Sequence, residues 1–187
     1  MKLHALTIDL LVYVLYPLWL LAGAIDYGCH RRTSIAATSG VVETWLHIAQ
    51  FVTIAIVFFG AIFLEPTLAA IALLGTTVIL HLVLSYVDVV YTQPKRYISP
   101  LEQHVHGFLD VLPIIAVCLL ALLGLSEPQS TTGFALRFHE PATGITLLIA
   151  SFIGLAGFPV IEEHLRTAMR ASRRTNNVHV AHAEVNS

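Results

Sequence analysis

Apolar residues run in five long stretches along the chain, and short polar segments separate them. The stretches cover about residues 6–29, 41–64, 67–91, 99–124 and 143–161. Each is close to the ~20 residues that an α-helix needs to cross the hydrocarbon core of a bilayer. The pattern therefore predicts an all-α integral membrane protein, a helical bundle of five transmembrane helices.

The polar breaks carry the signals that end and begin helices. The second stretch ends at Glu65-Pro66, and the fourth opens with Ser99-Pro100. Proline is tolerated in the first turn of a helix and disrupts later turns, so these positions are natural boundaries. The fifth stretch continues as a basic helix to residue 174. The sequence thus predicts a single transmembrane helical domain over residues 1–174.

Lysine and arginine lie almost entirely at one end of the predicted bundle. The basic residues at that end are Arg31, Arg32, Lys95, Arg96, Arg166, Arg170, Arg173 and Arg174, whereas the other end has Lys2 and Arg137. Basic segments stay on the cytoplasmic side of a membrane. This asymmetry predicts a multi-pass protein with its N-terminus outside and its C-terminus in the cytoplasm; the bacterial inner (plasma) membrane is the location implied by the resemblance to bacterial proteins given below. Residues 175–187 are predicted to form a disordered cytoplasmic tail.

The amino-acid composition agrees with a membrane location. Its unusual feature is the number of histidines. The 187 residues are 56% hydrophobic and 12% charged, about half the charged share of a soluble domain. The net charge of −2 gives no basic surface for nucleic acid. Cys29 and Cys118 lie in different stretches, without the spacing of a cysteine zinc site or a disulfide framework. The ten histidines therefore raise the question of a ligand.

Three of the predicted helices carry a carboxylate four residues before a histidine, at the same end of the bundle. The pairs are Asp26/His30, Glu43/His47 and Glu102/His106. Positions four apart lie on one face of a helix. Ionisable groups at membrane depth are costly and usually face the protein interior, a partner or an ion. Three such pairs predict a shared polar centre inside the bundle.

Further ionisable residues extend this pattern deeper into the membrane. His81 and Asp88 lie seven residues apart in the third stretch, and Asp110 follows His106 by four. At ~1.5 Å rise per residue, antiparallel neighbours would place His81 opposite Asp110, and Asp88 opposite Glu102 or His106. The depths of these residues are therefore mutually consistent.

Carboxylate and imidazole together suit iron, manganese or zinc. We therefore predict a metal centre near the inner leaflet. Its predicted ligands are Asp26, His30, Glu43, His47, His81, Asp88, Glu102, His106 and Asp110. The expected cofactor is iron (di-iron) or zinc, with manganese as an alternative. Glu162, Glu163 and His164 border the basic helix, and the sequence leaves open whether any of them joins the centre.

Simpler interpretations of the same residues remain open at this point. A hydrogen-bonded polar network could stabilise the bundle without a metal ion. Asp88 could pair with Arg96 or Lys95, and Asp26 could pair with Arg31 or Arg32 at the interface. The dipole at a helix N-terminus would stabilise the ionised carboxylate of Glu43 without a metal ion.

The pattern of ligand-type residues resembles that of the ferritin-like di-metal carboxylate proteins. In those proteins facing helices project carboxylates and histidines inward. The resemblance implies a four-helix metal core plus one extra helix. Those proteins use Glu-x-x-His, whereas Glu43 and Glu102 here belong to Glu-x-x-x-His. This departure leaves a choice between one and two metal ions.

A second resemblance covers about residues 20–115. The motifs are Asp26-Tyr27-Gly28-Cys29-His30-Arg31, Glu43-x-x-x-His47 and Glu102-Gln103-His104-Val105-His106. They are similar to those of a group of small bacterial multi-pass membrane proteins. The resemblance implies a membrane location.

Together these features predict a membrane-embedded metalloprotein that performs redox or oxygen-dependent chemistry on a lipid or other apolar substrate. Its expected partners are membrane lipid and an electron-donor protein, and a homo-oligomer also fits. Three alternatives keep the polar centre and change its use: a zinc-dependent membrane hydrolase, a transporter or sensor for metal ions or protons, and a bis-histidine haem protein.

Overall fold

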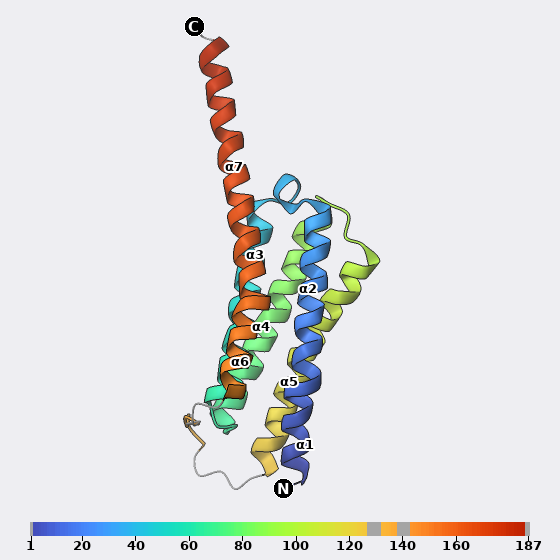
Figure 1. The fold of residues 1–187 in the computed structure, drawn as a ribbon, viewed down its shortest axis with the longest axis vertical. Helices are drawn as coiled ribbons and strands as arrows, with labels where there is room; N and C mark the ends of the chain where they lie inside the picture. The colour runs from blue at the N-terminus through green and yellow to red at the C-terminus, as the bar shows by residue number, and fades with distance from the viewer. Residues whose placement is uncertain (1, 127–131, 138–142, 186–187) are drawn as a thin grey trace.

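The computed structural model describes residues 2–126, 132–137 and 143–185, which form a bundle of long helices (Figure 1). The α-helices are α1 Lys2–Leu10, α2 Tyr16–Thr33, α3 Val41–Phe63, α4 Leu68–Thr92, α5 Pro100–Ser126, α6 Thr143–Ser151 and α7 Phe158–Val185. The other helical segments are η1 Leu11–Leu15, η2 Ile35–Ala37 and η3 Phe152–Gly157. The prediction of an all-helical chain is confirmed for these residues.

Five helical rods are long and apolar enough to cross a membrane, as the sequence predicted. They cover Leu3–Ala37, Val41–Phe63, Leu68–Thr92, Pro100–Ser126 and Thr143–Arg174. The first rod joins α1, η1 and α2, and the last joins α6, η3 and α7. The start of α1 and the end of α7 lie at opposite ends of the molecule (Figure 1), as an odd number of spans requires.

Both composite rods contain a π-helical turn two residues before a proline. η1 ends at Leu15 before Pro17, and η3 ends at Gly157 before Pro159. A proline in a helix lacks the N–H group and crowds the carbonyl group four residues earlier. In each rod that carbonyl belongs to the π-helical segment, where the wider turn accommodates the ring. The prolines therefore account for both irregular turns.

The core that holds the rods together lies between α3, α4 and α5. Its buried members are Val57, Leu74, Val78, Val117, Leu120 and Leu123. Gly60 of α3 lets Leu74 of α4 approach closely, because a Cβ atom on this glycine would lie 2.5 Å from Leu74 Cδ2. Gly124 of α5 likewise has the backbone oxygen of Pro66 against its Cα. This half of the bundle is stabilised by apolar packing.

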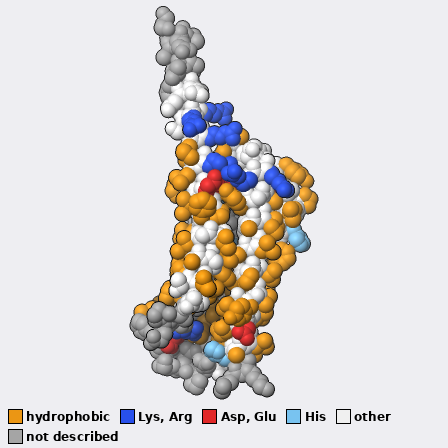
Figure 2. All heavy atoms as spheres, viewed as in Figure 1, with side chains coloured by type: hydrophobic (Ala, Val, Ile, Leu, Met, Phe, Trp, Pro, Cys, Tyr) orange, Lys and Arg blue, Asp and Glu red, His pale blue; other side chains and the backbone are white. Residues whose placement is uncertain are grey.

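Hydrophobic side chains also cover the outside of the bundle, and most of the visible Lys and Arg side chains gather near its upper end (Figure 2). Exposed apolar residues such as Ile79, Leu122 and Leu147 lie on several rods. An apolar outer surface of this kind suits contact with lipid. The five long apolar rods and this outer surface therefore indicate a membrane protein.

The structure differs from the sequence-based expectation at the C-terminal end of the chain. α7 continues as a helix to Val185 and projects beyond the bundle (Figure 1), whereas residues 175–187 were expected to be disordered. No glycine or proline follows Pro159 up to Val185, so no residue in this stretch breaks the helix.

Candidate metal centre

Eight acidic and histidine side chains, from all five rods, meet at the end of the bundle near η2. They are Asp26 and His30 of α2, Glu43 and His47 of α3, Asp88 of α4, Glu102 and His106 of α5, and Glu163 of α7. Their candidate ligand atoms form three overlapping groups, and within each group all atoms lie within 4.8 Å of one another. Glu43 and Glu102 are fully buried.

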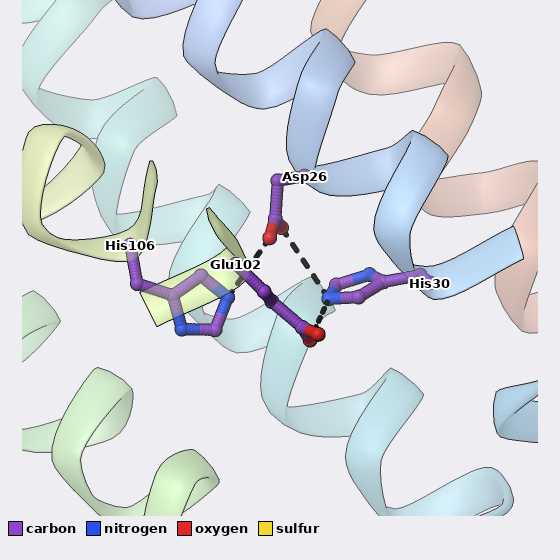
Figure 3. Close-up of side chains that lie close together, drawn as sticks. All are labelled: Asp26, His30, Glu102 and His106. Atoms are coloured by element: carbon purple, nitrogen blue, oxygen red, sulfur yellow. Dashed lines mark ion pairs between the residues drawn. The ribbon is translucent and has the colours of Figure 1, made fainter. Parts of the chain in front are cut away.

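The first group, which we call site one, consists of Asp26, His30, Glu102 and His106. Figure 3 shows the rings of His30 and His106 approaching from opposite sides, with the two carboxylates between them. His30 Nε2 lies 3.4 Å from Asp26 Oδ2 and 3.5 Å from Glu102 Oε1, and His106 Nε2 lies 3.0 Å from Asp26 Oδ1. Two helices supply the whole group, because each carries its acid and its histidine four residues apart.

The second group, site two, consists of Glu43, His47 and Asp88. His47 Nε2 lies 3.2 Å from Asp88 Oδ2 and 3.8 Å from Glu43 Oε1. Gln50 donates a hydrogen bond of 3.3 Å to Asp88 Oδ2. Site two thus repeats the plan of site one, since an acid and a histidine share one helix and a second acid comes from its neighbour.

Glu163 connects the two sites on the side of α7. Its Oε2 lies 3.4 Å from His30 Nδ1 and 3.0 Å from His47 Nδ1. The two imidazole rings are stacked, with centroids 4.6 Å apart and planes 6° apart. Both Nε2 atoms therefore face the carboxylates of sites one and two, while both Nδ1 atoms face Glu163. A carboxylate on the far ring nitrogen is the usual arrangement for a histidine that binds a metal ion.

Arg96, which lies between α4 and α5, connects the two sites on the opposite side. Its Nη2 lies 2.6 Å from Glu43 Oε1 and 2.6 Å from Glu102 Oε1. Ser39 also donates a hydrogen bond to Glu43. Burial acts to lower the pKa of Arg96, but the hydrogen bonds to Glu102 and Glu43 outweigh it, so the pKa is raised above its ordinary value. Arg96 is therefore a permanent positive charge at this end of the centre.

With its histidines neutral, the centre carries an excess of negative charge. It holds five carboxylates, and among the described residues Arg96 is the cation between them, with Arg166 at the rim, 3.7 Å from Glu163 Oε1. Buried charge without compensation is strongly unfavourable. Divalent cations would neutralise the excess.

Several buried atoms of the centre have no hydrogen-bond partner of good geometry among the described residues, although some of them belong to the ion pairs given above. They are Asp26 Oδ1, His30 Nε2, His47 Nε2, and both carboxylate oxygens of Glu102. With metal–ligand bonds of ~2.1 Å, two ligand atoms on one ion lie ~3.0–3.4 Å apart. The distances of 3.0–3.5 Å within site one agree with this spacing. The residues present therefore fit a bound metal ion.

The structure brings seven of the nine predicted ligands together and leaves two apart. His81 Nε2 lies 3.6 Å from Asp110 Oδ1, so these two residues face each other as their depths predicted. His81 Nδ1 bonds to Thr53, and Asp110 accepts a hydrogen bond from Ser85. Neither belongs to a ligand group among the described residues, because each lies one or two helical turns further from η2 than the centre.

Asp88 has different neighbours from those expected. Depth alone matched it with Glu102 or His106, and a simpler interpretation paired it with Arg96. The structure places it against His47 and Gln50 instead, and Arg96 bonds to Glu43 and Glu102.

Of the three residues that the sequence left open on the fifth span, Glu163 joins the centre. Glu162 accepts a hydrogen bond from Tyr27 and pairs with Arg31, and His164 bonds to Thr44. The sequence did not identify Arg96 as part of the centre. The feature that could have indicated it is its position in the short turn between two spans that both carry acidic residues.

No protein-family model matches the chain, and no curated protein or solved structure matches it. Its fold and site define the class: a helical protein with five membrane-spanning rods and a candidate carboxylate–histidine metal centre at one end. The function is therefore inferred from the geometry of that centre.

Proposed function

We propose that this protein is a membrane-embedded metalloprotein that binds two metal ions side by side near the cytoplasmic leaflet. The observation that carries the proposal is the meeting of eight ligand-type residues from five rods, with buried imidazole nitrogens and carboxylate oxygens facing one another at 3.0–3.5 Å in site one. Asp26, His30, Glu102 and His106 would hold one ion. Glu43, His47 and Asp88 would hold the other.

The proposed centre is a ferritin-like metal core of four helices with one extra helix. Helices α2, α3, α4 and α5 supply all residues of sites one and two, and α7 supplies Glu163. Glu163 and Arg96 would act as positioning residues. Glu163 orients both imidazole rings, and Arg96 keeps Glu43 and Glu102 from repelling each other. The 4.6 Å ring separation is compatible with two ions ~3.5–4 Å apart.

The activity we propose is redox or oxygen-dependent chemistry on a lipid or other apolar substrate. A mixed set of carboxylates and imidazoles suits iron best among redox metals, with manganese as an alternative. Iron would supply the redox chemistry when bound. Trp19, Phe51 and Ile54 line a cavity on the membrane side of the centre, and their apolar side chains would limit the access of water. Electrons would come from a partner protein at the basic end of the bundle.

The location we propose is the bacterial inner membrane, with the N-terminus outside. Support comes from the positions of the basic residues, which gather near the same end of the bundle as the centre (Figure 2). The opposite half is packed with the apolar cluster around Val57, Leu74 and Leu120. Among the described residues, an apolar half of this kind offers no polar path across the membrane, which disfavours transport of ions or protons.

Elemental analysis tests the proposal. The protein is purified in mild detergent without chelators, and its iron, manganese and zinc are measured per chain beside the His30→Ala and His47→Ala variants. We expect close to two iron ions per chain, and a loss of at least one in each variant. His104→Ala serves as the control, because His104 is exposed and lies outside the ligand groups. Folded protein without stoichiometric metal would contradict the proposal.

The identity of the metal separates the proposed activity from its main alternative. Zinc in place of iron, with no signal in Mössbauer or electron paramagnetic resonance spectra, would replace redox chemistry with hydrolysis. Zinc has no redox chemistry and acts by polarising a bond or activating water. The same ligand residues would hold either metal.

A further inference from the structure

A cavity of about 120 Å³ lies directly against the candidate metal centre, on its membrane side. We call it the inner cavity. Its polar wall consists of Asp26, Tyr27, His30, His47, Gln50, His81 and Glu163. The rest of its wall is mostly apolar, with Leu20, Phe51 and Leu155 among its members. One end of this cavity can therefore hold a polar group, and the remainder suits hydrocarbon.

A second cavity of about 180 Å³, the outer cavity, continues in the direction away from η2. Its wall is apolar along most of its length and includes Ile8, Leu11, Leu112 and Leu120. Trp19 and Ile54 line both cavities. The two cavities are therefore adjacent along the bundle, on either side of these two side chains.

The combined space is long. The inner cavity follows α2 from Trp19 to His30, and the outer cavity follows the same rod from Ile8 to Trp19. At ~1.5 Å per residue, each part extends for ~16 Å along the bundle. A compact molecule would leave most of such a space empty, whereas a long chain would fill it.

The inner cavity reaches the lipid-facing surface between α2 and the last rod. Leu155 of η3 lines this cavity and is 57% exposed. Gly23 of α2 also lines it, and a Cβ atom on this glycine would meet nothing within 4 Å. The wall between cavity and membrane is therefore thin on this side, and a molecule dissolved in the bilayer has a route to the centre.

We propose that the two cavities bind one fatty-acyl chain, which enters from the bilayer between α2 and η3. Its polar end lies in the inner cavity beside His30 and His47, and its hydrocarbon tail passes Trp19 into the outer cavity. A polar wall at one end and a long apolar remainder fit an acyl chain that carries a polar group at one end. The proposal names the substrate class of the centre and so rests on the proposed function.

Photocrosslinking tests the proposal. The purified full-length chain, reconstituted in nanodiscs, is exposed to palmitic acid that carries a terminal diazirine, and labelled peptides are mapped by mass spectrometry. We expect labels on the residues around the outer cavity, in η1, α3 and α5. A second arm uses phosphatidylethanolamine with the same diazirine chain. Labelling in both arms assigns the ligand to the acyl chain of an intact lipid, and labelling by the acid alone assigns it to free fatty acid.

Two pairs of variants separate the cavity from general effects on the bundle. Gly23→Leu narrows the proposed entrance, and Gly28→Leu is its control, because Gly28 also has open space but does not line the cavity. Ala116→Phe fills the outer cavity, and Ala121→Phe on the same helix is its control. We expect labelling at the outer cavity to fall about tenfold in each cavity variant and to stay unchanged in each control.

Metal content measured on the same samples distinguishes the two proposals. Labels confined to exposed faces of the bundle, or labelling equal in variants and controls, would overturn the acyl-chain site even if metal is bound. Cavity labelling without stoichiometric metal would retain the acyl-chain site and reject the metal centre. If Ala116→Phe does not fold, Gly23→Leu decides the outcome, because its position has room for a side chain.

Discussion

The two halves of this bundle are built from the same helices and stabilised in different ways. At one end, α3, α4 and α5 meet through Val57, Leu74, Val117 and Leu120, where Gly60 allows close approach. At the other end, the same three helices contribute acids and histidines that touch through charged groups. Apolar packing is non-directional and tolerates small shifts, whereas buried charge is stable only when each partner is in place.

The two halves therefore contribute to the stability of the bundle in different ways. The apolar half would hold the rods in register without any cofactor, because it buries hydrocarbon against hydrocarbon. The polar half depends on Arg96 and, in our proposal, on metal ions for its charge balance. Mutations in the apolar half should therefore change stability alone, and those in the polar half should couple stability to metal binding.

The largest effect is expected from Arg96→Met, which leaves Glu43 and Glu102 buried and unpaired. Breaking a buried ion pair by removing one partner costs ~3–5 kcal/mol. The free energy of unfolding, measured in detergent by chemical denaturation, should fall by about this amount. Arg32→Met, at an exposed position, should change it by less than ~0.5 kcal/mol. Equal effects of the two variants would show that Arg96 does not balance the charge of the centre.

In the apolar half, Gly124→Ala should destabilise the protein without changing its metal content. A Cβ atom there would lie 2.0 Å from the backbone oxygen of Pro66, so the helix must move, at a cost of ~1–3 kcal/mol. Gly75→Ala is the matched control, since nothing lies within 4 Å of its Cβ position. Thermal unfolding of the two variants, followed by circular dichroism, measures the difference. A metal loss in Gly124→Ala would indicate that the two halves are coupled.

Glu163→Gln should weaken metal binding while the fold is retained. Glu163 faces the Nδ1 atoms of both His30 and His47, and loss of such an orienting carboxylate typically lowers metal affinity 10–100-fold. Competition with a chelator of known affinity measures the change. The neighbouring variant Glu162→Gln is the control, because Glu162 pairs with Tyr27 and Arg31 away from the centre. Equal losses in both variants would contradict the role of Glu163.

The smallest effect on metal is expected from His81→Ala. His81 bonds to Thr53 and faces Asp110, outside the ligand groups of the described residues. Metal content per chain should therefore stay within the error of the wild-type value, in contrast to His30→Ala. Loss of an ion in His81→Ala would show that His81 is a ligand and that the centre lies deeper in the bundle than we propose.

Much of the fold could be predicted because the membrane imposes strong constraints. The spans expected at residues 41–64, 67–91 and 99–124 correspond to α3, α4 and α5 within two residues or so at each end. A helix is the structure that satisfies all backbone groups within one segment in lipid, so long apolar stretches leave little choice. The C-terminal boundary was less predictable, because charged sequence without a helix breaker suits both a solvated helix and a disordered tail.

The candidate site was harder to predict in detail. The three acid–histidine pairs were visible, because spacing of four places each pair on one face. The sequence did not show which of Glu162 and Glu163 faces the centre. The π-helical segment η3 precedes both and adds a residue to one turn, which rotates the following helix by ~100° relative to a regular count. The partners of Arg96 also depend on how the turn between α4 and α5 folds back over α3.

The sequence by itself determined that five apolar segments cross a membrane and that acids and histidines lie at one depth, because hydropathy and helical spacing are local properties of the chain. Only the tertiary structure decided that Glu163 and Arg96 connect two similar groups of ligands, and that His81 and Asp110 stand apart from them. Those relations depend on the rotation and tilt of each rod against its neighbours. Packing between distant segments sets both, so no count along one helix could reveal them.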